Sequence, residues 1–170
     1  MPLPGLRRAD HIGFTVPDLD QAHRFLVDVL GCEYLYSLGP YRHDDDWMAT
    51  HLAVLPRAEM ENRFFRCGGE TLLEVFHYTA PDQRDVPPRN SDVGGHHVAL
   101  YVDDLDAAIE HLRAAGVEGL DGPTASKGPA AGNRWIYFLS PWGMQFELVS
   151  APGGKRWDRE NAARQDEPHE

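Results

Sequence analysis

Two stretches of the chain repeat the same order of apolar and polar positions. Residues 10–22 and 96–108 align with an offset of 86, which places His11 over His97, and alternating apolar residues follow each histidine. Alternation with a period of two predicts a β-strand. An aspartate then stands where a helix N-cap is expected, and apolar residues at helical spacing continue to a glycine. Each stretch therefore predicts a strand followed by a helix.

Further strand-like segments follow each predicted helix. They are residues 32–38, 63–67 and 71–78 after the first helix, and residues 117–120, 134–139 and 144–150 after the second. The pattern predicts an α+β fold of two β-α-β-β-β modules. The expected parts are a first module at residues 9–78 with an insertion at 39–60, a linker at 79–93, a second module at 94–151 and a polar C-terminal tail at 152–170.

Charge and composition narrow the range of partners. The formal net charge is −11, whereas nucleic-acid binding needs clustered Lys and Arg. No apolar run approaches the roughly 18 residues that a membrane span requires. Two cysteines, Cys32 and Cys67, are too few for a disulfide framework, so we expect a reducing compartment and a cytoplasmic protein. The expected partner is a small molecule, with no nucleic acid and no membrane.

Two histidines and two glutamates are expected on the sheet face opposite the helices. If the apolar alternates of the first strand of each module pack under its helix, His11 and His97 point to the other face. Glu74 and Glu147 stand in otherwise apolar closing strands, where an unpaired carboxylate is costly. A metal ion is one compensation. A single strand histidine is more often structural than a ligand, so the symmetry of the four positions carries the argument.

The motifs around these positions carry a family resemblance. They read Asp-His-Ile-Gly-Phe from Asp10, Leu-Leu-Glu-Val-Phe from Leu72, His-His-Val-Ala-Leu from His96, and Ser-Pro-Trp-Gly-Met-Gln-Phe-Glu-Leu-Val from Ser140. Together they resemble the vicinal-oxygen-chelate superfamily, which includes glyoxalase I, methylmalonyl-CoA epimerase, extradiol dioxygenases and the fosfomycin- and bleomycin-resistance proteins. The resemblance covers about residues 9–150.

The resemblance implies a specific architecture and cofactor. The two modules would form a cupped, eight-stranded mixed sheet around one divalent metal, which could be Ni, Co, Zn, Fe or Mn. Its ligands fall on His11, Glu74, His97 and Glu147, the same four residues that the alternation selects. The family also shows closure of the cup across a dimer, and a homodimer is expected. Candidates to line the cup and contact substrate are Thr15, His51, Phe76, Tyr101, Tyr137 and Gln145.

Three functions remain open at this stage. The first is an isomerase, epimerase or glyoxalase-like lyase, in which Glu147 or Glu74 removes a proton next to a metal-chelated carbonyl. The second is an extradiol dioxygenase, since Tyr137 precedes Glu147 as in that signature; the histidine that the signature wants is missing between Pro123 and Ile136. The third is a non-catalytic drug-binding resistance protein. The four ligand positions favour proton transfer over the other two.

Overall fold

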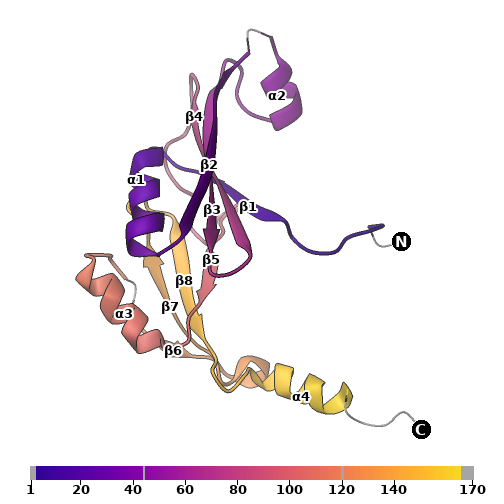
Figure 1. Ribbon diagram of the computed structural model, residues 1–170, viewed down its shortest axis with the longest axis vertical. Helices are drawn as coiled ribbons and strands as arrows, with labels where there is room; N and C mark the ends of the chain where they lie inside the picture. Colours follow the sequence, from indigo (N-terminus) through magenta and orange to yellow (C-terminus); the bar gives the residue numbers. More distant parts are fainter. Residues whose placement is uncertain (1–2, 44, 120, 166–170) are drawn as a thin grey trace. The chain divides into compact units, whose positions relative to one another are not determined.

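The computed structural model describes residues 3–43, 45–119 and 121–165 (Figure 1). Two compact units divide the chain between Val86 and Pro87. Among the described residues, no helix has the length and apolar character to cross a membrane. The module boundaries predicted from the sequence remain predictions.

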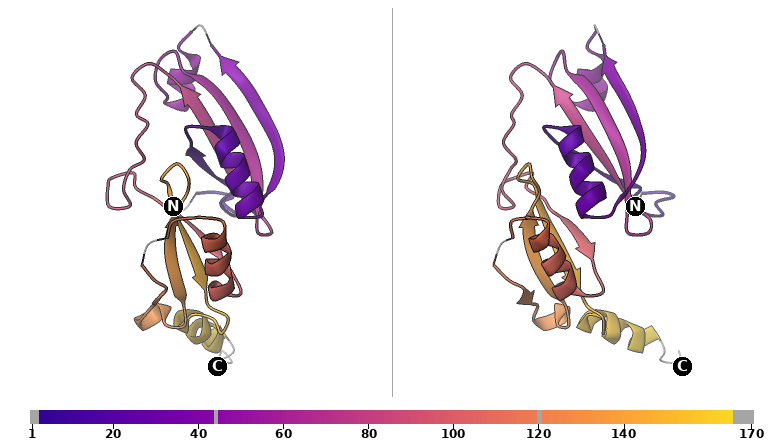
Figure 2. Two further views of the ribbon diagram at one scale, coloured as in Figure 1. Left: turned by 90° about the vertical axis from the view of Figure 1, so that its left-hand side faces the viewer. Right: turned by 60° about the vertical axis from the view of Figure 1, so that its left-hand side comes forward.

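The first unit is a mixed four-stranded sheet with three helical segments. Its elements are β1 (His11–Thr15), α1 (Leu19–Arg24), the π-helical turn η1 (Phe25–Val29), β2 (Glu33–Arg42), α2 (Trp47–Leu52), β3 (Glu59–Cys67) and β4 (Thr71–Thr79). The strand order is β1-β4-β3-β2. Strand β1 runs parallel to β4, and the other pairs are antiparallel. Figure 2 shows α1 lying along this sheet.

The second unit repeats this arrangement with shorter strands. Its elements are β5 (Val98–Tyr101), α3 (Leu105–Ala114), β6 (Thr124–Ala125), the 3-10 turn η2 (Gly128–Ala130), β7 (Arg134–Leu139), β8 (Gln145–Ser150) and α4 (Arg156–Gln165). The order is β5-β8-β7-β6, again with one parallel pair. The α+β class is therefore confirmed. The eight strands form two four-stranded sheets, where the resemblance implied one cupped sheet.

Several segments differ in detail from the sequence prediction. Within the insertion at 39–60, the β2–β3 pairing continues to Arg42 and Glu59, and α2 lies between the two strands. The predicted strand at 117–120 is reduced to a single bridge between Gly119 and Phe138, and residue 120 lies outside the described residues. The edge strand there is β6 instead. The polar C-terminal tail contains α4.

Each unit has its core between the helix and the inner face of the sheet. In the first unit, the most deeply buried apolar side chains are Val16, Ala22, Phe25, Leu26, Phe65, Leu73 and Val75. In the second, they are Val98, Leu105, Phe138, Phe146 and Leu148. Ile12 was expected to pack under α1 but is 38% exposed. The alternation rule therefore predicts the buried face correctly for Phe14 and Val16, but not for Ile12 at the start of β1.

The two units share matching polar contacts, which cap each helix and join it to its sheet. Asp18 caps α1 by accepting hydrogen bonds from the backbone N–H groups of Asp20 and Gln21, and Asp104 caps α3 in the same way. Both predicted N-caps are confirmed. The guanidinium of Arg63 on β3 also binds Asp20 at 2.7 Å. An equivalent pair in the second unit is formed by Arg134 and Asp106 at 2.9 Å, so the repeat extends to surface ion pairs.

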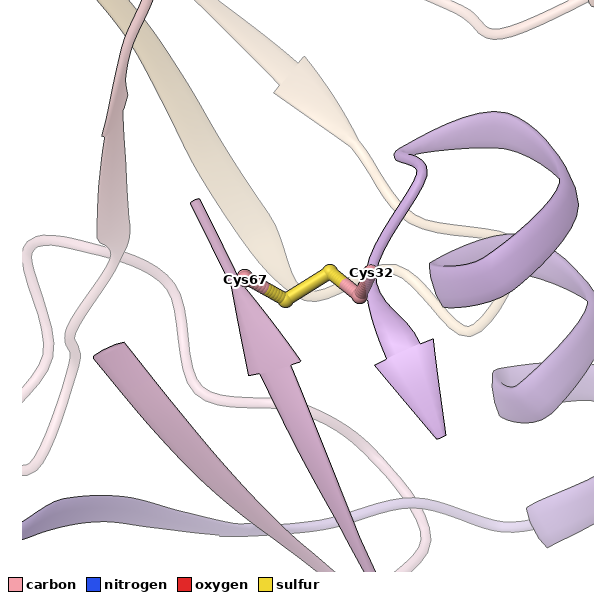
Figure 3. Close-up of a disulfide and its surroundings, with 2 residues drawn as sticks. All are labelled: Cys32 and Cys67. Atoms are coloured by element: carbon pink, nitrogen blue, oxygen red, sulfur yellow. A yellow bond between two sulfur atoms is a disulfide. The ribbon is translucent and has the colours of Figure 1, made fainter. Parts of the chain in front are cut away.

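The two cysteines form a disulfide in the first unit (Figure 3). Cys32 directly precedes β2, Cys67 ends β3, and both side chains are buried. The cysteine count had been taken as a sign of a reducing compartment. The two residues are neighbours across the β2–β3 pair and bond to each other, so the cysteine count does not support that expectation, and the cytoplasmic location stays a prediction.

Candidate functional site

A histidine and a glutamate meet on the open face of the first sheet. His11 begins β1, and Glu74 lies on β4 beside Gly13 in the parallel register. The His11 Nε2 atom is 3.1 Å from Glu74 Oε2. Gly13 suits this place, because a Cβ there would come within 3.3 Å of the Phe76 ring. The local strand register therefore brings the two predicted ligands of this unit together.

The second unit repeats the pair. His97 directly precedes β5, and Glu147 lies on β8 opposite Tyr137 of β7. The His97 Nε2 atom is 3.2 Å from Glu147 Oε2. His96, its chain neighbour, instead places Nδ1 3.0 Å from the Gly94 carbonyl oxygen. Of these two adjacent imidazoles, His97 is therefore the one that meets the glutamate.

The outer nitrogen of each imidazole also faces an oxygen acceptor. His11 Nδ1 is 3.0 Å from Asp10 Oδ2, and His97 Nδ1 is 3.2 Å from Asn90 Oδ1. A ring whose Nδ1–H is donated outward presents a lone pair at Nε2. The close contact between Nε2 and the glutamate oxygen then needs either a second proton on the ring or a cation bound at Nε2. Metal-binding histidines characteristically have such an acceptor behind them, so both pairs fit a divalent metal.

Asn62 joins the first pair and was not singled out by the sequence analysis. It lies on β3, is 2% exposed, and donates from Nδ2 to Glu74 Oε1 at 2.6 Å. The two oxygens of Glu74 therefore have different partners, His11 and Asn62. The signal available in the sequence was a polar residue, Asn62, two positions before Phe64 and therefore on the same face of the strand. Its meaning depends on the β3–β4 register, which a single sequence does not specify.

Most of the other candidate residues lie on the strands that carry the two pairs. Thr15 is opposite Phe76 in the β1–β4 register, on the same face as Glu74. Tyr137 packs against His97 with ring centroids 5.2 Å apart. Gln145 shares a face of β8 with Glu147, and Tyr101 ends β5 with its side chain exposed.

His51 belongs to a different environment. It lies on α2, with Nδ1 2.9 Å from the Trp47 carbonyl oxygen and its ring stacked on the Trp47 indole. Within the described part of the chain, no recorded contact links it to either glutamate. Its place in a substrate site remains a prediction.

Two phenols lie near the glutamates. Burial, and next the charge of Glu74, raise the pKa of Tyr78. Burial, and next the charge of Glu147, raise the pKa of Tyr137. Both side chains therefore keep their O–H at neutral pH and can act as hydrogen-bond donors on the face that carries the carboxylates.

Each pair alone is an incomplete site. Across the described ranges, no three His, Cys, Asp or Glu side chains gather as a metal-binding group. One imidazole and one carboxylate supply two ligands, whereas tight protein sites for these metals usually use three or four.

Comparison with known proteins identifies the family. Residues 10–138 match the Glyoxalase/Bleomycin resistance protein/Dioxygenase superfamily. The chain belongs to this superfamily. A 2-epi-5-epi-valiolone epimerase from an Actinomyces species is 46% identical over 168 residues, covering 98% of this chain and 91% of that protein.

Two further comparisons concern less similar proteins. Mouse mitochondrial methylmalonyl-CoA epimerase is 27% identical over 155 residues, covering 88% of this chain and 76% of that protein. The crystal structure of a glyoxalase family protein from Bacillus cereus superposes with a TM-score of 0.67 at 19% identity, covering 88% of this chain and 97% of that one. The family resemblance and the fold class inferred from the sequence are thus confirmed.

Proposed function

We propose that the protein is a divalent-metal-dependent epimerase that acts on a carbon next to the carbonyl of a polyhydroxylated ketone. The observation that carries the proposal is the repeated pair, in which His Nε2 meets a glutamate and His Nδ1 meets an outer acceptor. The ligand set comprises His11, Glu74, His97 and Glu147.

The proposed reaction uses the metal and the protein for different tasks. A bound divalent metal would polarise the substrate carbonyl and stabilise negative charge on its oxygen. Glu147 is the proposed base and takes the proton from the neighbouring carbon. Glu74 is the proposed metal ligand that stays in place. Inversion follows when a proton from solvent water reaches the opposite side of that carbon, while Glu147 gives the proton that it took to solvent.

The substrate class follows the more similar relative. The name of the Actinomyces protein, 46% identical, specifies epimerisation of a valiolone, a hydroxylated cyclic ketone. Methylmalonyl-CoA epimerase, at 27% identity, acts on a thioester. The net charge of −11 also disfavours a ligand with several phosphates. A ketone with neighbouring hydroxyl groups is therefore the first substrate to test.

Hydrogen exchange with solvent tests this reaction directly. The protein loaded with Mn, Co, Ni, Zn or Fe is incubated without oxygen in deuterated water with hydroxylated cyclic ketones and, separately, with methylmalonyl thioesters. Deuterium should enter the ketone at the carbon next to its carbonyl, and Glu147→Gln should lower this rate by about 10² to 10⁴. Oxygen uptake with a catechol, with iron as the only activating metal, would instead assign a ring-cleaving dioxygenase. Absence of metal binding and of exchange would leave a non-catalytic binding protein.

A further inference from the structure

Asn62 is an unusual residue for the interior of a strand. Its side chain is 2% exposed, and Nδ2 donates to Glu74 Oε1 at 2.6 Å. Its Oδ1 atom is buried without a hydrogen-bond partner among the described residues. Burying an amide oxygen without a partner is unfavourable. The position therefore retains a costly group whose one recorded side-chain contact is with a proposed metal ligand.

The contact fixes Glu74 from the side opposite His11. His11 Nε2 approaches Oε2 and Asn62 Nδ2 approaches Oε1, so both carboxylate oxygens are engaged. The carboxylate is 16% exposed. Reversing the amide would place Asn62 Oδ1 against the carboxylate, which is repulsive, so the contact also specifies the amide orientation. Glu74 has little freedom to swing away from its position.

Glu147 lacks this support in the second unit. Asn62 is the cross-strand partner of Phe76, two residues after Glu74, and the equivalent partner of Val149, two residues after Glu147, is Trp135. Among the described residues, the one polar contact recorded for the Glu147 carboxylate is with His97. The two glutamates occupy equivalent strands but differ in how firmly they are held.

We infer that Asn62 is a positioning residue that holds Glu74 as a fixed metal ligand and leaves Glu147 as the carboxylate free to move a proton. The inference rests on the proposed function and adds to it the basis for the division of labour between the two glutamates. Proton transfer needs a carboxylate that can change partners during the reaction, whereas a metal ligand benefits from a fixed orientation.

The first test measures metal binding without catalysis. Mn(II) is titrated into wild type, Asn62→Leu, Asn62→Ala and Glu74→Gln, with free Mn(II) followed by electron paramagnetic resonance. Both Asn62 variants should weaken Mn(II) binding about 10- to 100-fold, the usual effect of losing an outer-shell partner. The alanine variant removes volume and the leucine variant retains it, so agreement between them separates the lost amide from altered packing.

Asn133→Leu is the matched control for the Asn62 variants. Asn133 is another buried asparagine with an unpartnered Oδ1, but its amide lies near Ser126 in the second unit. This control should lower the midpoint of thermal unfolding without changing the Kd for Mn(II). Unchanged Mn(II) binding in both Asn62 variants, with weakened binding in Glu74→Gln, would overturn the inference while sparing the proposed function. Unchanged binding in Glu74→Gln would overturn both.

The second test separates ligand from base. At saturating Mn(II), the deuterium exchange rate of Asn62→Leu should return close to that of wild type, because Glu147 is intact. The rate of Glu147→Gln should stay about 10² to 10⁴ lower at any Mn(II) concentration. A deficit in Asn62→Leu that saturating Mn(II) does not restore would identify Glu74 as the base and overturn the assignment.

Discussion

His96 and His97 are adjacent in the chain and have separate environments. The ring of His96 contacts the backbone carbonyl of Gly94, whereas that of His97 lies between Asn90 and Glu147. Because successive side chains of an extended segment point to opposite sides, one position decides which imidazole can serve a metal. His96 and His97 therefore offer a matched comparison between a proposed ligand and its chain neighbour.

The first prediction compares the two alanine variants of these histidines. His97→Ala removes a proposed ligand and should lower the metal content of the purified protein well below that of wild type. His96→Ala should keep both metal content and exchange activity. Elemental analysis after purification without chelator measures this. Metal loss in His96→Ala alone would show that the strand is shifted by one residue.

Local patterns in the sequence predict some residue contacts and not others. Alternation places His11 and Glu74 on one face because it needs only the period of a strand. The contact of Asn62 with Glu74 depends on the pairing of β3 with β4, and the contact of His97 with Asn90 depends on the path of a loop. Neither is encoded in a local pattern, so both required the structure.

At the scale of elements, the cap of α1 is a pH-dependent contact. Donation from the backbone N–H groups of Gln21 and Asp20 lowers the pKa of Asp18 below its usual value. A carboxylate whose pKa is lowered on folding stabilises the native state above its unfolded pKa, and this contribution is lost as pH falls through the folded pKa. The exposed position of Asp18 makes the effect small but its sign is defined.

The second prediction uses Asp18→Asn, which keeps a capping oxygen without the charge. Wild type should be the more stable protein at pH 7, since a charged cap interacts better with the helix N-terminus. Its advantage should shrink as the pH falls below about 4. Urea unfolding midpoints across a pH series measure the difference. An equal difference at every pH would contradict a charge-based cap.

The third prediction concerns α2 at the end of the β2–β3 hairpin. Met48 is buried there, whereas Trp47 is exposed and stacks between His43 and His51. Met48→Ala should reduce the free energy of unfolding by about 2 to 5 kcal/mol. Trp47→Ala and His51→Ala should alter substrate KM more than stability. Equal loss of melting temperature in all three variants, with KM unchanged, would make the segment purely structural.

Sequence patterns predicted these elements unevenly. The caps and the strand alternation are local, so α1, α3 and the paired strands were predicted close to their observed positions. The length of the β2–β3 hairpin was not, because residues 39–60 lack a clean apolar alternation and only their ends pair, as Tyr41 with Met60 and Arg42 with Glu59. The helix in the tail was missed because its charged sequence has little apolar periodicity.

At the scale of the whole molecule, duplication gives each unit one imidazole–carboxylate pair. Each unit contributes one imidazole and one carboxylate, and neither pair has the ligand number of a tight site. Two pairs together supply four ligands, with two carboxylates that balance a divalent charge. The proposed four-ligand set draws on both units, so it predicts that both must be intact for metal to bind.

The fourth prediction is metal stoichiometry. Wild type should bind one metal ion per chain, and removing either pair (His11→Ala with Glu74→Ala, or His97→Ala with Glu147→Ala) should abolish tight binding. Two independent sites would instead give two ions per chain, with one retained in each double variant. Calorimetric titration with Mn(II) distinguishes these cases. Light scattering on the same samples tests the expected homodimer.

The Cys32–Cys67 bond also determines what happens to the chain after a backbone cut. It joins residues 35 positions apart and encloses the exposed loop that contains Arg57. Limited trypsin digestion confined to that loop should leave two fragments that migrate together until a reductant is added. Sheet pairing can then keep β2 and β3 in register, because the fragments cannot diffuse apart. Separation of the fragments without reductant would show that the cysteines are unpaired in the purified protein.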